Sequence, residues 1–97
     1  MSRHVQFRPQ AEHEVLEVRA WYDGRQEGLG HELGEAVDQL ITRITDNPFA
    51  FPVTYDTTRR ATLRRFPYAI YFRLLDDDIL VLAGHGRQHE RRWQSRS

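Results

Sequence analysis

The chain has 97 residues, with fourteen arginines, fourteen acidic residues, no lysine and no cysteine, so its formal net charge at pH 7 is zero. This length suits a single domain, predicted over 1–97, and the lack of cysteine excludes disulfides and thiolate metal sites. No apolar run approaches the roughly 20 residues that cross a bilayer, and the N-terminus lacks the apolar region of a secretory signal. We therefore expect a cytoplasmic protein with no membrane partner.

Charge is divided unevenly along the chain. Residues 1–58 carry five arginines and ten acids, for a net −5, whereas 59–97 carry nine arginines and four acids, for a net +5. Arginine binds phosphates and carboxylates through paired hydrogen bonds but stays protonated at pH 7, so it is a poor general base. The C-terminal half therefore favours an acidic partner, unless the two halves neutralise each other within the fold.

The first elements are a short strand and a helix. Val5 and Phe7 alternate with polar residues, which predicts a strand that Pro9 ends. The apolar period then changes to steps of three and four, which predicts a helix over 9–23 with one buried stripe: Ala11, Val15, Val18 and Tyr22.

A second helix is predicted over 31–46. Glycines between Asp23 and Gly30 end the first helix, and Pro48 ends the second because it disfavours helical geometry in the residue before it. Two amphipathic helices with so short a link are expected to pack antiparallel. The apolar loop that follows, 49–52, is expected to close one end of the core, and 53–58 fits either irregular chain or the start of a strand.

A β-hairpin forms the predicted centre of the fold. The runs 68–75 and 79–83 are rich in β-branched and aromatic residues and are separated by three aspartates, which favour a turn. Within 68–75 one face is fully apolar and the other mostly so, which is typical of a strand in the middle of a sheet. The opposite face begins at Ala69 and includes Arg73.

The segment before the hairpin, 59–66, is rich in arginine. Leu63 and Phe66 are expected to point inward while the four arginines gather at one edge of the sheet. Arg64 and Arg65 alternate in a predicted strand, so they are expected to point to opposite faces, and only one of them shares a surface with Arg73 or Arg87. For the other, pairing with a glutamate or aspartate of the helices is the alternative.

These elements predict an α+β fold. An N-terminal strand precedes an antiparallel helical hairpin, which packs on a mainly antiparallel sheet. The chain then ends in a short helix or tail, in which Trp93 is the only large apolar residue and is expected to anchor it to the core.

Several short motifs in this order resemble the RelE/ParE superfamily of bacterial toxins. They cover nearly the whole chain and comprise Pro9-x-Ala11, Trp21-Tyr22, Gly28-Leu29-Gly30, Asn47-Pro48 with Phe51-Pro52, Leu63-Arg64-Arg65-Phe66-Pro67-Tyr68, Val81-Leu82-Ala83 and His85-x-Arg87 with Trp93. The resemblance implies the toxin of a type II toxin–antitoxin module, in a hetero-oligomer with a cognate antitoxin that is ParD-like or similar. RelE-like members cleave messenger RNA on the ribosome, whereas ParE-like members inhibit DNA gyrase by protein contact.

The residues favour the ParE-like function, although they do not exclude an enzyme. RelE-like members generally place an arginine shortly after the position of Tyr68 and a tyrosine or histidine near the C-terminus, where this chain has Ala69 and Trp93. A ribosome-dependent nuclease would have to use the remaining proton carriers and phosphate-binding groups, namely His85, His89, Arg64, Arg73 and Arg87. An inactive relic that only binds its antitoxin is a third alternative.

For a protein that acts by contact, the expected target- or antitoxin-binding residues are Arg64, Arg65, Arg73, Arg87 and Trp93. No cofactor is expected. No metal site is expected either, because His85 and His89 lie four apart but no third ligand is apparent.

Overall fold

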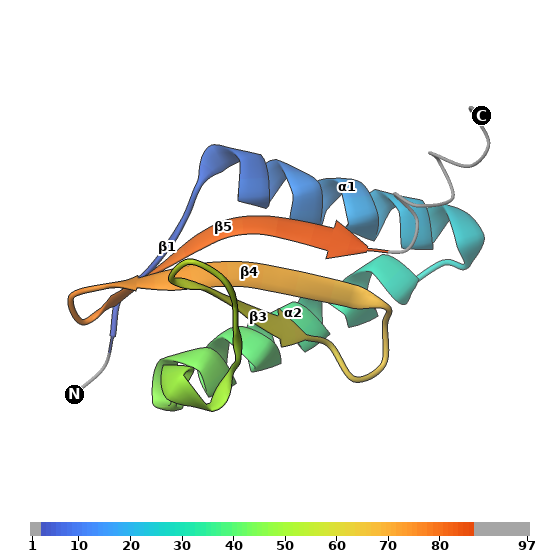
Figure 1. Cartoon of the computed structure of the whole chain (residues 1–97). Helices are drawn as coiled ribbons and strands as arrows, with labels where there is room; N and C mark the ends of the chain where they lie inside the picture. The colour runs from blue at the N-terminus through green and yellow to red at the C-terminus, as the bar shows by residue number, and fades with distance from the viewer. Residues whose placement is uncertain (1–2, 87–97) are drawn as a thin grey trace.

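The computed structural model describes residues 3–86 (Figure 1). The elements in chain order are β1 (Val5–Phe7), α1 (Pro9–Arg25), α2 (Leu29–Asp46), a 3₁₀ turn η1 (Pro48–Ala50), β2 (Val53–Tyr55), β3 (Thr58–Thr62), β4 (Tyr68–Leu75) and β5 (Asp78–Gly86). The five strands form one sheet in the order β1-β5-β4-β3-β2. All its neighbours are antiparallel except β1 and β5, which are parallel.

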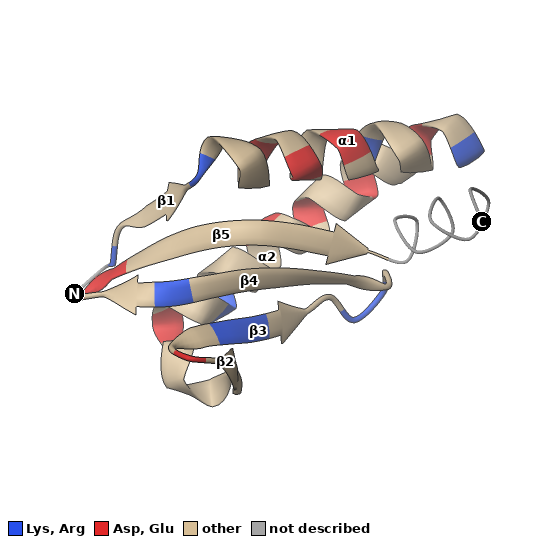
Figure 2. Ribbon diagram, turned by 45° about the horizontal axis from the view of Figure 1, so that its top comes forward, with Lys and Arg blue, Asp and Glu red and all other residues tan. Residues whose placement is uncertain are grey.

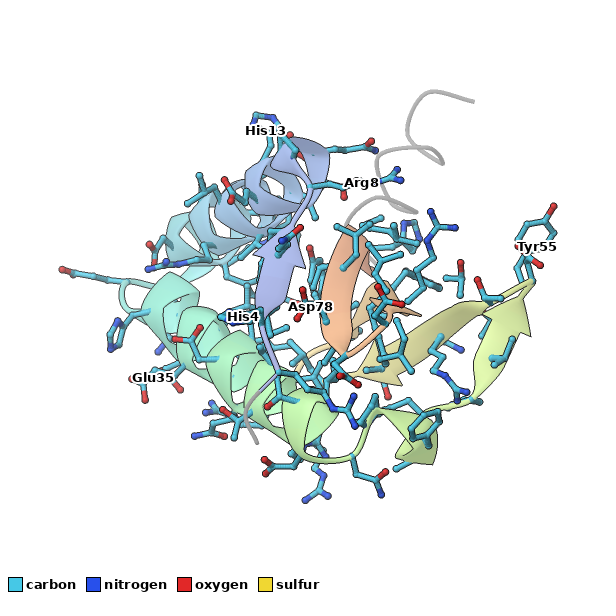
Figure 3. All side chains as sticks on the ribbon, turned by 90° about the vertical axis from the view of Figure 1, so that its left-hand side faces the viewer. His4, Arg8, His13, Glu35, Tyr55 and Asp78 are labelled. Carbon is cyan, nitrogen blue, oxygen red and sulfur yellow. The ribbon has the colours of Figure 1, made fainter. Side chains whose placement is uncertain are left out.

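The two helices lie on one side of the sheet (Figure 3). The predicted α+β fold, with an N-terminal strand and a helical hairpin on a mainly antiparallel sheet, is therefore confirmed. The buried stripes of α1 and α2 form the helical side of the core, and β4, part of β5, and Ala61, Leu63 and Phe66 form the side of the sheet. The fully buried large side chains include Val18, Leu33, Leu40, Ile44, Ile70, Phe72, Ile79 and Val81.

The link between the helices is shorter than the glycines suggested. Helix α1 continues through Gly24 to Arg25, and α2 begins at Leu29, so only three residues connect them. Gly28 has a φ of 90°, which L-residues with a Cβ rarely adopt, and it turns the chain into α2. Gly30 already lies within α2, where its N–H donates to the Asp23 carboxylate at 2.7 Å.

The hairpin of β4 and β5 is confirmed, with a tighter turn than expected. Asp78 begins β5, so only Asp76 and Asp77 form the turn, and Asp76 has a φ of 56°. The register shifts between Tyr71 and Phe72, because Tyr71 pairs with Ala83 whereas Phe72 pairs with Val81. The resulting β-bulge at Leu82 keeps one face of β5 toward the helices before the shift and after it.

The segment 49–58 differs from the expectation in two ways. Phe51 does pack against Phe72, with ring centroids 5.9 Å apart, but Phe49 is exposed and does not close the core. The ambiguous residues 53–58 contain β2, a fifth strand that pairs with β3 as far as Arg59. A strand of three exposed residues has no alternating pattern that sequence alone can detect.

No helix among residues 3–86 is both long enough and apolar enough to cross a membrane. Figure 2 shows that arginines lie on β3, β4 and the loop between these strands, while most of the acids lie along α1 and α2, which also carry arginines. Helices α1 and α2 together carry eight acids and three arginines, so the negative charge of the N-terminal half lies mainly on the helices.

Candidate functional site

The face of the sheet opposite the helices carries the candidate site, which we call the open face. Residues directly opposite each other in neighbouring strands point to the same side. The register gives two such rows across three strands, Arg60–Tyr71–Ala83 and Thr62–Ala69–His85. Among the described residues no helix lies over these rows (Figure 3).

The two rows border a cavity of about 220 Å³. Its wall brings together the guanidinium of Arg60, the phenol of Tyr71 and the imidazole of His85, each from a different strand. Ala69 lies between Thr62 and His85 in the register, so the centre of the cavity is uncharged. The site can therefore bind an anion at its border and contains two groups that are able to transfer protons.

Arg73 lies on the open face two residues beyond Tyr71 and opposite Leu80. It is half-buried, and its Nε is fully buried with no hydrogen-bond partner in the described part of the chain. An unpaired buried donor costs free energy. Arg73 thus lies on the open face, but it does not line the cavity that Arg60, Tyr71 and His85 share.

Arg64 and Arg65 lie elsewhere, and the expectation that they alternate in a strand was wrong. Both residues lie in the bend between β3 and β4, since β3 ends at Thr62. Arg65 donates to the Glu32 carboxylate of α2 at 2.6 Å, which is the predicted pairing with a helix acid. Arg64 lines two cavities together with Arg43 of α2, and one of them is also lined by Arg60 and Thr62 of the open face.

The remaining candidates, Arg87, His89 and Trp93, lie outside the described residues. Within residues 3–86 no group of three or more histidine or acidic side chains is placed to hold a metal ion. His85, from the predicted pair, is exposed on the open face at the end of β5.

Helix α1 holds β5 in place behind the site. The N–H of Gly84 donates to the Glu14 carboxylate at 2.9 Å. Beside this bond the hydroxyl of Tyr68 is buried without a hydrogen-bond partner in the described chain. Burial raises the pKa of the Tyr68 phenol well above its usual value, and the negative charges of Glu14 and Glu17 raise it further. The phenol therefore stays neutral and acts in packing.

Arg60, Thr62 and Tyr71 were not among the residues predicted for the site. Tyr71 could have been found, because it alternates with Ala69 and Arg73 along the predicted strand. Arg60 and Thr62 could not, because their place in the site depends on the β3–β4 register, which the sequence does not determine.

Comparison with known proteins gives matches among solved structures alone. No protein-family model matches the chain, and no curated protein matches it in sequence. A chain of the chromosomal ParDE TA system from P. aeruginosa superposes with a TM-score of 0.77 at 13% identity, covering 88% of this chain and 96% of that one.

Two further structures are similar over their whole length. A chain of the RelBE2 toxin–antitoxin complex from Mycobacterium tuberculosis gives a TM-score of 0.63 at 16% identity, covering 90% of this chain and 100% of that one. The isolated E. coli RelE toxin gives a TM-score of 0.62 at 12% identity, covering 99% of this chain and 100% of that one. Identities this low establish the fold alone, and the chain therefore has the RelE/ParE toxin fold.

Proposed function

We propose that the chain is the toxin of a type II toxin–antitoxin module and is neutralised by a cognate antitoxin. The proposal rests mainly on the structural similarity of this chain to chains of two toxin–antitoxin systems. The superpositions cover 96% of the chain from the ParDE system and 100% of the chain from the RelBE2 complex. An arginine-bearing face with no helix over it among residues 3–86 supports the proposal, because a toxin needs a surface that its antitoxin or target can reach.

Within this class we propose DNA gyrase as the target, inhibited by protein contact. Ala69 lies in the middle of the Thr62–Ala69–His85 row that lines the cavity of the open face, and no residue of this row is an arginine that could stabilise a phosphate undergoing cleavage. Arg60 and Arg73 can still bind acidic side chains of a protein, which requires charge and shape but no proton transfer. The TM-score of 0.77 to the ParDE chain also supports the ParE-like assignment.

One observation favours a second candidate, ribosome-dependent cleavage of messenger RNA. Arg60, Tyr71 and His85 border a single cavity, so a phosphate-binding group and two proton carriers lie close together. In such a reaction one of the proton carriers would take the proton of the ribose 2′-hydroxyl, and the arginine would stabilise the phosphate.

Two assays with the purified chain distinguish these functions. The first follows supercoiling by purified gyrase, and the second maps messenger RNA ends in a translating extract. We expect loss of supercoiling, no new RNA ends, and weaker inhibition by R60Q than by the control R8Q. Arg8 is an exposed arginine that directly precedes α1 and does not line the cavity of the open face.

Cleavage that disappears in Y71F or H85Q, with supercoiling unchanged, would replace gyrase inhibition by the nuclease. If neither assay responds but the antitoxin still binds, the chain is an inactive relic. If no antitoxin encoded beside the gene binds the chain, the toxin–antitoxin assignment itself is wrong.

A further inference from the structure

The longest uncharged segment of the chain lies at one edge of the sheet. Residues 47–55 contain no charged side chain, although 29% of all residues in the chain are charged. They form η1 and β2, and β2 is the last strand of the sheet, paired with β3 alone. Seven of these nine residues are exposed. The segment is therefore an uncharged surface rather than part of the core.

This surface contains three large apolar side chains. Phe49 is 65% exposed, Val53 49% and Tyr55 80%. Tyr55 projects from the edge of the sheet, away from both helices (Figure 3). Exposed apolar residues are common singly, but three within seven residues at one edge form a patch, and apolar patches mark interaction sites. We call residues 49–55 the β2 edge.

The backbone of β2 is open to a further strand. Natural edge strands are protected by charged side chains, by bulges or by their short length. Strand β2 is short, and its register with β3 shifts between Val53 and Tyr55, but it has no charge. No described strand pairs with its outer side. The strand can therefore form a few hydrogen bonds with another strand, and most of the affinity has to come from side chains.

Two residues of opposite charge adjoin the β2 edge. Asp56 lies in the turn between β2 and β3, and its carboxylate forms no ion pair within residues 3–86. The guanidinium of Arg59 donates to the carbonyl of Phe51 at 2.6 Å and lies over the ring of Phe49, 5.3 Å from its centroid. Arg59 therefore reaches across β2 to the edge, where its remaining N–H groups can bind a carboxylate from another molecule.

We propose that two copies of the chain pair through their β2 edges, in antiparallel orientation about a two-fold axis near Thr54. Such an interface is self-complementary, because each contact is made twice. Asp56 of one copy then lies opposite Pro52 of the other, beside the Arg59 of that second copy, and two identical ion pairs form. The inference uses the described geometry alone and does not depend on the toxin assignment.

The apolar side chains set the strength of the pairing. About the same axis, Val53 of each copy lies opposite Tyr55 of the other. Burying these two residues and Phe49 in both copies removes on the order of 700 Å² from solvent, since an aromatic side chain buries about 150–250 Å². Stable interfaces bury roughly 1,200–2,000 Å². We therefore expect a reversible dimer that forms only at high concentration.

Other occupants fit the β2 edge less well. A nucleic acid would place phosphates against an uncharged apolar segment and next to the carboxylate of Asp56. An acidic peptide would meet the same carboxylate. A second copy brings no like charge to the edge, because residues 47–55 are uncharged in both copies.

The first test is sedimentation of the full chain from low micromolar to high micromolar concentration, where we expect a monomer–dimer equilibrium. Val53→Lys should raise the dissociation constant at least tenfold, because a charge on an edge strand opposes pairing. Leu16→Lys makes the same change at an exposed residue of α1 and should dimerise as the parent chain does. A chain that stays monomeric throughout, or equal effects of the two substitutions, would overturn the proposal. Assembly that grows beyond a dimer would also overturn it, because a two-fold interface closes.

The second test removes the charge of the turn. Asp56 has a φ of 53°, which asparagine tolerates, so Asp56→Asn should keep the turn. It should weaken the dimer about fivefold, because two exposed ion pairs are lost. Asp76→Asn is the matched control, since Asp76 has a φ of 56° in the turn between β4 and β5. Equal dimerisation of the two variants would show that Asp56 does not meet Arg59 of the second copy.

The third test measures the orientation of the two copies. The chain has no cysteine, so Thr57→Cys gives a single attachment point for a spin label. We mix spin-labelled copies with ¹⁵N-labelled copies that carry no spin label. Broadening between copies should be strongest at Phe51, which lies opposite Thr57 in the antiparallel arrangement. Strongest broadening at Thr57 itself, or on α1 or α2, would overturn the proposed interface.

Discussion

The ring of Tyr68 lies directly against the backbone of Gly84, and its hydroxyl occupies the place where a Cβ at residue 84 would be. The N–H of the same glycine donates to Glu14 of α1. The tyrosine that begins β4, which belongs to a motif that gave the resemblance, therefore packs against the glycine that precedes His85. Tyr68 and Gly84 set the distance between β4, β5 and α1, and with it the position of His85 on the open face.

The first prediction is that Gly84→Ala destabilises the fold. The added methyl group would overlap the phenol of Tyr68, which is only 2% exposed and cannot move into solvent. Overpacking of this kind typically costs about 1–3 kcal/mol in the free energy of unfolding. Unfolding in urea measures this loss of free energy. The same substitution on a Tyr68→Leu background should cost less, because the smaller side chain makes room, and equal costs on both backgrounds would disprove the contact.

The second prediction concerns stability at alkaline pH. The pKa of Tyr68 is raised in the folded state above its unfolded value of about 10, so the unfolded chain releases the phenolic proton first. The stability that the neutral phenol provides is therefore complete below the unfolded pKa of about 10. It is lost as the pH rises above that unfolded pKa. The chain has no lysine, so no lysine titrates in the same range.

The measurement is the free energy of unfolding in urea at several values from about pH 8 to about pH 11. Tyr68→Phe should show a smaller loss across this range than the parent chain. At neutral pH it should be as stable or more stable, because it removes a buried hydroxyl that has no partner. Tyr55→Phe is the control, since Tyr55 is 80% exposed on β2 (Figure 3) and should leave the pH dependence unchanged.

The third prediction compares two glycines of the helical hairpin. A Cβ at Gly30 would lie 2.6 Å from the Asp23 carboxylate and closer still to the backbone carbonyl of Arg19, so Gly30→Ala should strongly destabilise the fold. Gly24 lies in α1 with nothing within 4 Å of its Cβ position. Gly24→Ala should therefore gain helix propensity, raising the free energy of unfolding by about 0.5–1 kcal/mol. Similar effects of the two substitutions on thermal unfolding would contradict the close contact of α1 with α2 at Gly30.

Periodicity was sufficient to predict the long elements, because each of them buries one continuous face. The stripes of α1 and α2 and the alternation of β4 follow directly from burial against a common core. Strand β2 was missed because its three residues are all exposed. The last two residues of α1, Gly24 and Arg25, were missed because Gly24 is tolerated near a helix end when the backbone is not strained there.

The candidate site was predictable only in part, because it depends on register. Arg73 and His85 could be assigned to it from their places on a strand. Arg60 enters the site because it pairs with Tyr71, which no local pattern indicates. Arg64 and Arg65 were wrongly placed in a strand, since β3 ends at Thr62, and both side chains lie against α2.

The last prediction separates stability from function at Arg73. Its buried Nε has no partner in the described chain, so Arg73→Met keeps the apolar stem and removes an unsatisfied donor. The free energy of unfolding should stay constant or rise by up to about 1 kcal/mol. Inhibition of gyrase should weaken about tenfold or more, because the charge-assisted hydrogen bond to the target is lost. Arg8→Met serves as the control in both measurements, and full inhibition by Arg73→Met would show that this arginine does not contact the target.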